Sequence, residues 1–314
     1  MRHLVTGAAG FLGSHLSDAL LAQGHEVIGL DNLFTGSREN MPSHSRFDFV
    51  RADVCDTFHF EADVIWNAAC PASPKHYQKN PARTIETGFV GTWNALKCAR
   101  ACGARMIQFS TSEVYGSPEI SPQREDYWGH VNPVGDRACY DESKRAAESL
   151  CVAFNQQFGT DVRIARVFNT YGPRLAQGDG RVVSNFIVQA LRGEKLTVYG
   201  DGMQTRSFAY CDDTIAGLLA LAKMQSHRYR GVEIVNLGNP DERTILSLAE
   251  DVIRIVGSGE IEFRGLPADD PRRRCPDITR ARELLGWEPK VSTLDGIGRT
   301  VEWFRGRVKG KEAA

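Results

Sequence analysis

The chain has 314 residues, enough for one large or two ordinary domains with a sizeable core. Its composition is that of an ordinary soluble protein, and a formal net charge of -1 gives no electrostatic reason to expect binding to nucleic acid or a membrane surface. No apolar run has the length of a membrane span, and Met1 leads directly into an apolar segment without a signal peptide.

The cysteines indicate a reducing environment. Eight of them are scattered along the chain, and none has the Cys-x-x-Cys spacing of a redox or zinc motif. Cys98 and Cys102 are spaced as on one face of a helix. We therefore expect reduced thiols, a cytoplasmic location, no metal site and no disulfide framework.

The first 23 residues predict a strand, a glycine-rich turn and a helix. An apolar strand at residues 2–6 precedes the G-x-x-G-x-x-G loop, and a helical pattern covers residues 14–23. Glycines let the backbone approach a pyrophosphate at a helix N-terminus. Such a loop alone can be only a turn, but the strand before it and the helix after it favour a dinucleotide site. The loop residues expected to contact the cofactor are Gly7, Gly10, Phe11, Leu12 and Gly13.

Two further predicted strands end in acidic residues. Residues 26–30 lead to Asp31, whose carboxylate would accept hydrogen bonds from the adenosine ribose and repel a 2′-phosphate, which favours NAD over NADP. Residues 47–51 lead to Asp53, which could receive the adenine amino group or cap a helix, and the sequence favours neither. The residues assigned to the adenosine are Asp31, Asn32, Asp53 and Val54.

The next predicted strands place small and polar residues at one edge of a sheet. Residues 64–69 end in small residues such as Ala68, as the close passage of a cofactor requires. A long helix is expected at residues 82–101, and a fifth strand at 106–109. Because ligands bind at the strand carboxyl ends of a doubly wound sheet, we expect Thr111, Ser112 and Glu113 to point into the site, although such clusters are often mere caps.

Tyr140 and Lys144 are four residues apart in a predicted helix at residues 140–157, so their side chains lie one above the other. A lysine ammonium beside a phenol lowers the tyrosine pKa, which would give a general base near neutral pH. This spacing is common by chance, but the predicted nucleotide site earlier in the chain favours a catalytic role. In that role the tyrosine would take the proton of a sugar hydroxyl while a hydride passes to a nicotinamide. The polar segment 119–138 is expected to be a lid.

Beyond a sixth strand at residues 161–167, the alternation of strands and helices breaks down. We expect a helix at 181–191, a short strand at 196–199, a helix from about residue 213 and a last helix that ends before Gly286. Several arginines lie beside aromatic residues and glycines here, which would suit a nucleotide diphosphate, although scattered arginines are usually solvated.

These features together resemble the extended short-chain dehydrogenase/reductase family. The glycine loop, Asp31, Thr111 and the Tyr140/Lys144 pair follow the order of that family along nearly the whole chain. The resemblance implies a homodimer with retained NAD, in which the long helix near residues 82–101 and the helix that carries Lys144 make the contact.

The resemblance also implies an α/β fold with two parts. A Rossmann-type doubly wound parallel sheet would cover residues 1–170 and bind NAD. A smaller C-terminal α/β domain would cover residues 171–314, bind a nucleotide sugar, and be interleaved with the first near residues 205–240.

Within the family, the chain is most similar to the UDP-glucuronic acid decarboxylases, which form UDP-xylose. The pair Ser112-Glu113 is typical of this group, whereas the 4,6-dehydratases carry Asp-Glu to protonate a departing hydroxyl, and the 4-epimerases usually lack the glutamate. Longer matching stretches lie at residues 70–74, 111–116, 125–133, 137–142, 168–174 and 179–186.

The resemblance implies a complete reaction. Tyr140, aided by Thr111, would take the C4 hydroxyl proton while hydride passes to NAD, and Lys144 would bind the nicotinamide ribose. The 4-ketone then makes the C5 carboxylate a β-keto acid that loses CO2, and NADH returns hydride to C4. The residues that would manage the carboxylate and the reprotonation of C5 are Ser112, Glu113 and Arg274. Those expected to bind the substrate are Glu86, Asn169, Arg174, Asn185, Tyr199, Arg206 and Arg272.

Two positions depart from the decarboxylase pattern. Glu86 and Gly88 stand where the similar enzymes carry lysine and asparagine, in a stretch that abuts the sugar, and Glu86 should repel a glucuronate carboxylate if it faces the site. One alternative is therefore another NAD-dependent nucleotide-sugar enzyme, either a 4-epimerase or a 4,6-dehydratase. A second alternative is a non-catalytic NAD-binding protein, and the intact Tyr140/Lys144 pair argues against it.

Overall fold

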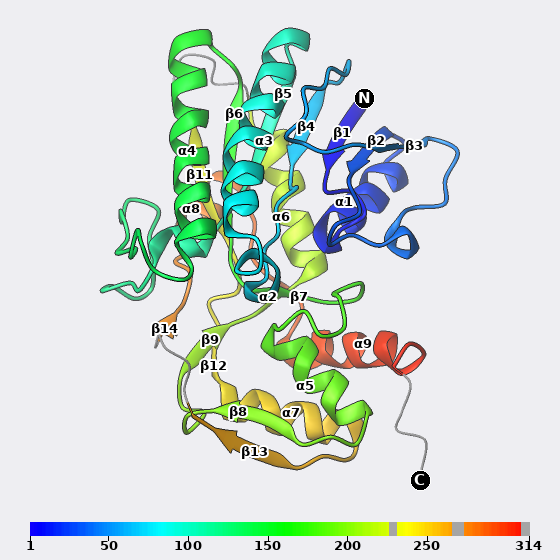
Figure 1. Ribbon diagram of the computed structural model, residues 1–314, viewed down its shortest axis with the longest axis vertical. Coiled ribbons are helices and arrows are strands. Elements are labelled where there is room, and N and C mark those ends of the chain that lie inside the picture. Colours follow the sequence, from blue (N-terminus) through cyan, green and yellow to red (C-terminus); the bar gives the residue numbers. More distant parts are fainter. Residues whose placement is uncertain (226–230, 266–272, 309–314) are drawn as a thin grey trace.

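The larger half of the molecule is built on one parallel sheet. The computed structural model describes residues 1–225, 231–265 and 273–308, and the sheet has the strand order β11-β6-β5-β4-β1-β2-β3 (Figure 1). Every pair of neighbours in it runs parallel, which confirms the predicted doubly wound α/β fold. The strands are β1 (Arg2–Thr6), β2 (Glu26–Asp31), β3 (Phe47–Arg51), β4 (Val64–Asn67), β5 (Arg105–Thr111), β6 (Val162–Val167) and β11 (Glu233–Leu237).

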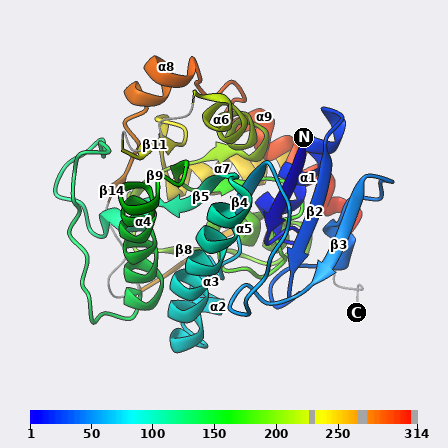
Figure 2. The same ribbon diagram turned by 90° about the horizontal axis from the view of Figure 1, so that it is seen from above.

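Helices cover both faces of this sheet, as Figure 2 shows for α3 and α4 on one side and α6 on the other. Successive strand residues point to opposite faces, so Val5 joins the core under α1 and α6, whereas Leu4 joins the core under α3 and α4. The covering helices are α1 (Phe11–Ala22), α3 (Pro81–Cys102), α4 (Ala138–Phe158), α6 (Cys211–Lys223) and α8 (Thr279–Leu285). No helix in the described ranges is long and apolar enough to cross a membrane.

The chain leaves the sheet after β6 and returns to it as β11. After the excursion through the smaller half, α6 packs beside α1, and β11 then pairs with β6 from Glu233↔Arg163 to Leu237↔Val167. The loss of regular alternation after residue 167 was expected, but the seventh strand was not assigned from the sequence.

The smaller half packs three helices around a second core, in the lower part of Figure 1. The helices are α5 (Val182–Leu191), α7 (Ile245–Val256) and α9 (Thr293–Arg305). Its short strands are β7 (Thr170–Tyr171), β8 (Leu196–Tyr199), β9 (Thr205–Ser207), β10 (Ala209–Tyr210), β12 (Glu242–Thr244), β13 (Ile261–Arg264) and β14 (Arg273–Arg274). Single turns complete the described chain: η1 (Arg38–Asn40), α2 (Pro74–Tyr77) and η2 (Ser112–Tyr115).

Helix α9 corrects the prediction that the last helix ends before Gly286. The Ser292 hydroxyl accepts a hydrogen bond from the backbone N–H of Asp295 and so caps the N-terminus of α9. Ile297, Val301 and Phe304 then bury one face of the helix in the second core. Both signals, the capping serine and the apolar spacing, are present in the sequence.

Candidate active site

A cavity of about 1510 Å³ opens at the carboxyl ends of the sheet strands and reaches the smaller half. This volume exceeds the roughly 300–1,000 Å³ of ordinary small-ligand sites, so it can hold a dinucleotide and a second nucleotide together. The residues predicted for the site that line it are Gly7, Gly10, Phe11, Leu12, Gly13, Asp31, Asn32, Asp53, Val54, Ala68, Thr111, Ser112, Glu113, Tyr140, Lys144, Asn169, Arg174, Asn185, Tyr199, Arg206 and Arg274.

The turn between β1 and α1 forms a cradle that side chains would fill. Gly7 has a φ of 72°, in the left-handed region, and a Cβ on Gly13 would overlap the Gly7 carbonyl oxygen. Gly10 precedes α1 and has no side chain to cap it, and no acidic residue lies in the first turn of α1. The positive end of the α1 dipole thus faces the cavity, which fits the pyrophosphate of a dinucleotide.

Asp31 lies at the end of β2 and is 7% exposed. The backbone N–H groups of Ala9 and Leu33 donate to its carboxylate at 3.0 and 2.7 Å. Burial raises the pKa of Asp31, and these two hydrogen bonds only partly offset that effect. The carboxylate is held in one orientation at the cavity wall, as the predicted ribose contact would need.

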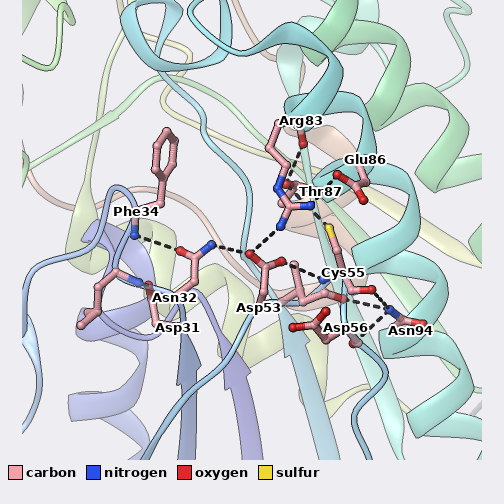
Figure 3. Close-up of polar contacts among 12 residues, drawn as sticks. Asp31, Asn32, Phe34, Asp53, Cys55, Asp56, Arg83, Glu86, Thr87 and Asn94 are labelled. Atoms are coloured by element: carbon pink, nitrogen blue, oxygen red, sulfur yellow. Dashed lines mark hydrogen bonds and ion pairs between the residues drawn. The ribbon is translucent and has the colours of Figure 1, made fainter.

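Asp53 accepts three hydrogen bonds at the adenosine end of the cavity (Figure 3). The donors are the backbone N–H of Cys55 at 2.9 Å, Asn32 Nδ2 at 2.8 Å and Arg83 Nη2 at 2.6 Å. Burial opposes ionisation, but these hydrogen bonds and the arginine charge lower the pKa of Asp53. No helix begins at Asp53, so the helix-cap alternative is wrong, and the carboxylate instead fixes a tight turn beside the cavity.

Tyr140 is buried deep in the cavity wall, where its ring stacks on that of Tyr77 with 5.1 Å between centroids. Lys144 Nζ donates to the Phe109 carbonyl at 2.8 Å and lies 5.8 Å from the centroid of the Tyr140 ring. Burial raises the pKa of Tyr140, the charges of Cys70 and Glu113 add to this, and a hydrogen bond with Thr111 opposes it. The pKa of Tyr140 is thus raised in this structure and not lowered as expected from the Lys144 charge, because burial is the largest influence on it.

Glu113 lies between two arginines at the sugar end of the cavity. Arg137 Nη2 donates to one carboxylate oxygen at 2.6 Å, and Arg274, itself 4% exposed, pairs with the other. Burial opposes ionisation of Glu113, but the two guanidinium groups lower its pKa, so it is held as a carboxylate. Because both carboxylate oxygens are bonded to arginines, Glu113 is held as an anion that can orient neighbouring groups but is not placed to donate a proton.

The model of the NAD dependent epimerase/dehydratase family matches residues 3–238. A UDP-glucuronic acid decarboxylase of Xenopus tropicalis is 51% identical over 97% of this chain and 72% of its own length. UDP-glucuronic acid decarboxylase 5 of Arabidopsis thaliana is 51% identical over 98% of this chain and 90% of its own length. The chain belongs to the NAD dependent epimerase/dehydratase family. Among solved structures, the UDP-glucuronic acid 4-epimerase of Bacillus cereus with UDP-glucuronic acid and NAD is 30% identical, with a TM-score of 0.87 over 98% of this chain and 99% of that one.

In this epimerase/dehydratase, the residues predicted for the uridine diphosphate come from separate elements of the smaller half. Arg206 lies on β9 and is 7% exposed, and Arg174 follows β7 with a φ of 68° and pairs with Asp18 at 2.6 Å. The remaining residues are Asn169 between β6 and β7, Asn185 in the first turns of α5 and Tyr199 at the end of β8. Arg272 lies outside the described residues.

The structure places Glu86 away from the cavity, against the expectation that it faces the sugar. Its carboxylate pairs with Arg83, one turn earlier on α3, and its side chain is 46% exposed (Figure 3). The described lining includes Arg83 and Thr87 but not Glu86. Gly88 is not among the lining residues either, and because a Cβ there would lie 2.5 Å from Ser143 Oγ, its lack of a side chain lets α3 pack against α4.

The segment 119–138, expected to be a lid, is anchored to the rest of the structure at several points. Gln123 is fully buried and pairs with residues 275–277, and the ring of Tyr127 stacks on that of Tyr115. The other end of the segment supplies Arg137 to Glu113. Arg137 was missed as a site residue, although it stands in one of the stretches shared with the decarboxylases.

Proposed function

We propose that this protein is an NAD-dependent decarboxylase that converts UDP-glucuronic acid to UDP-xylose. The observation that carries the proposal is the 51% identity with the X. tropicalis UDP-glucuronic acid decarboxylase over 97% of this chain. The arginine pair around Glu113 supports it, because guanidinium groups are the natural partners of a sugar carboxylate.

The cradle at Gly7 and Gly13 and the α1 N-terminus would hold the pyrophosphate of NAD, and Asp31 would hold its ribose. Bound NAD supplies a hydride acceptor for C4, a positive charge beside the phenol and the hydride that is later returned. Lys144 lines the same cavity and would bind the nicotinamide ribose, since its ammonium has donors beyond the one given to the Phe109 carbonyl.

Tyr140 takes the C4 hydroxyl proton, with Thr111 as its hydrogen-bond partner. Burial keeps Tyr140 a phenol until positive charge is present beside it, so it becomes a base only in the loaded site. This restricts proton removal to the complex in which C4 can be oxidised.

Decarboxylation follows from the 4-ketone. The C5–C6 bond breaks, its electron pair enters a C4–C5 enolate, and CO2 leaves. Ser112 and Arg274 lie where they can hold the carboxylate before this step, and the enolate then takes a proton at C5. Glu113 is suited to orient groups but not to donate that proton, because both of its oxygens accept from arginines.

The test is incubation of the purified protein with UDP-glucuronic acid, with and without added NAD, followed by mass measurement and proton NMR of the product. A product lighter by CO2, with a pentose spin system, is expected. A product of unchanged mass would instead make the protein a 4-epimerase of the B. cereus type, and loss of water would make it a dehydratase.

A homodimer is the proposed assembly. Ile85, Phe89 and Trp93 recur every four residues along α3, and they are 48%, 38% and 43% exposed. An apolar stripe at this spacing is typical of a helix that packs against another helix, here the same helix of a second copy. Phe89→Glu should convert a dimer to a monomer in light scattering, and a wild-type monomer would exclude the proposal.

We also propose a cytoplasmic location. All eight cysteines are free thiols, and five of them are buried. A reducing compartment keeps such thiols unpaired, which supports the proposal.

A further inference from the structure

Asp141 is a buried acid that the reaction above does not use. It follows Tyr140 in the first turn of α4, is 5% exposed, and its Oδ1 has no hydrogen-bond partner among the described residues. The buried hydroxyl of Tyr77, which faces the same charges, also lacks a partner there. A buried carboxylate oxygen without a hydrogen-bond partner is costly, so the presence of Asp141 here needs an explanation.

The charges around Asp141 give that reason. Arg137 and Arg274 bring two positive charges, and Glu113 and Asp141 bring two negative charges when both are ionised. If the proposed function holds, the sugar carboxylate adds a third negative charge beside the same two arginines. Charge balance then requires a proton, and Asp141 is the acid able to take it, because both oxygens of Glu113 are bonded to arginines.

We infer that Asp141 takes up one proton when the carboxylate of UDP-glucuronic acid binds beside Arg137 and Arg274, and that it releases this proton once CO2 has left. The cluster is thus neutral before binding, with substrate bound and after CO2 has left. Asp141 does not line the cavity, so it does not touch the sugar, and it acts on the sugar carboxylate through the charges of the two arginines as a positioning residue.

The titration of Asp141 agrees with this role. Burial and the charge of Glu113 raise the pKa of Asp141 to about 7, against the opposing charges of Arg137 and Arg274. Glu142, the next residue of α4, adds a smaller effect in the same upward direction. Among the described residues, Tyr77, Cys139 and Tyr140 also interact with these charges, and burial raises the pKa of each, so all three stay protonated.

Calorimetry can count the proton. We would titrate UDP-glucuronic acid into a Tyr140→Phe background, which prevents turnover, at pH 8 in two buffers of different ionisation enthalpy. An uptake of about 0.9 proton is expected with UDP-glucuronic acid, since a pKa near 7 leaves Asp141 mostly ionised at pH 8, and none with UDP-glucose, which lacks the carboxylate. Asp141→Asn should abolish the uptake, whereas Glu142→Gln, on the more exposed side of the same turn, should keep it.

Equal uptake with both sugars, or unchanged uptake in Asp141→Asn, would overturn the inference. The comparison of the two sugars needs no Asp141 variant, so it decides even if that variant does not fold. Failure of the proposed function looks different, since UDP-glucuronic acid would then bind with proton uptake but release no CO2.

Steady-state kinetics separates the proton role from a structural one. In the active enzyme, KM for UDP-glucuronic acid should rise above pH 7, as Asp141 must regain its proton. Asp141→Asn is permanently neutral, so it should lose this rise, and its KM should stay near the low-pH value of the wild type as the pH increases. Equal damage at every pH would indicate a structural role and contradict the inference.

Discussion

Replacing Gln123 with alanine should both destabilise the fold and loosen Arg274. The Gln123 side chain is fully buried, accepts from the backbone N–H of Cys275 at 2.9 Å and donates to the Ile120 carbonyl at 2.7 Å. Its backbone also pairs with Cys275 and Asp277. Gln123 therefore fixes the segment that directly follows Arg274, and Arg274 carries the contact with Glu113.

The magnitude follows from the two side-chain hydrogen bonds. The alanine variant leaves the buried N–H of Cys275 unpaired, at about 1–3 kcal/mol, whereas the carbonyl of the exposed residue Ile120 can bond to water instead. We therefore expect a loss of about 1–3 kcal/mol in unfolding free energy. Loss of about 1.4 kcal/mol in the positioning of Arg274 would raise KM for UDP-glucuronic acid about tenfold.

Urea unfolding followed by circular dichroism measures the first effect, and steady-state decarboxylation measures the second. Gln156→Ala, at an exposed position of α4, is the matched control and should change stability by less than about 0.5 kcal/mol. Lower stability with an unchanged KM would refute the reasoning, because Arg274 would then be held without Gln123.

Three further substitutions test the cofactor half and the base. Glu86→Lys should weaken NAD binding about two- to fivefold, because it removes the partly exposed ion pair with Arg83, and it should leave KM for the sugar unchanged. A changed sugar preference in product assays would instead indicate that Glu86 belongs to the substrate site. Tyr140→Phe should abolish the transient absorbance of reduced nicotinamide but keep NAD bound, and undiminished turnover would remove Tyr140 from the base role. Asp31→Ala should weaken NAD by about 1–3 kcal/mol in calorimetry, and unchanged affinity would contradict the ribose contact.

The cofactor half of the molecule was predictable because its signals are local. The strands predicted at residues 2–6 and 47–51 have the same bounds in the structure, and the glycine loop follows β1 directly. Apolar runs, glycines and strand-end acids each lie within a few residues of the element that they specify. Once those strands are parallel neighbours, their carboxyl ends must meet at one cavity.

The sugar end was less predictable because its key pairs join distant segments. Glu113 and Arg274 are 161 residues apart, and no periodicity or motif spacing specifies such an ion pair. The composition of the segment around Arg137 indicated an irregular loop, and only its burial and pairing reveal a fixed element. Glu86 is the opposite case, since Arg83 stands three residues earlier and the i,i+3 pair could have been recognised.

Four acids in or near the cavity show that arginine contacts decide which of them stay ionised. Burial is the largest single influence on the pKa of Asp31, Asp53, Glu113 and Asp141, and it opposes ionisation in all four. The two acids that accept hydrogen bonds from arginine, Asp53 and Glu113, have lowered pKa values, and the two that do not have raised ones. The site therefore combines acids held as anions with acids whose charge can change, and Asp141, next to the arginines proposed to hold the sugar carboxylate, is of the second kind.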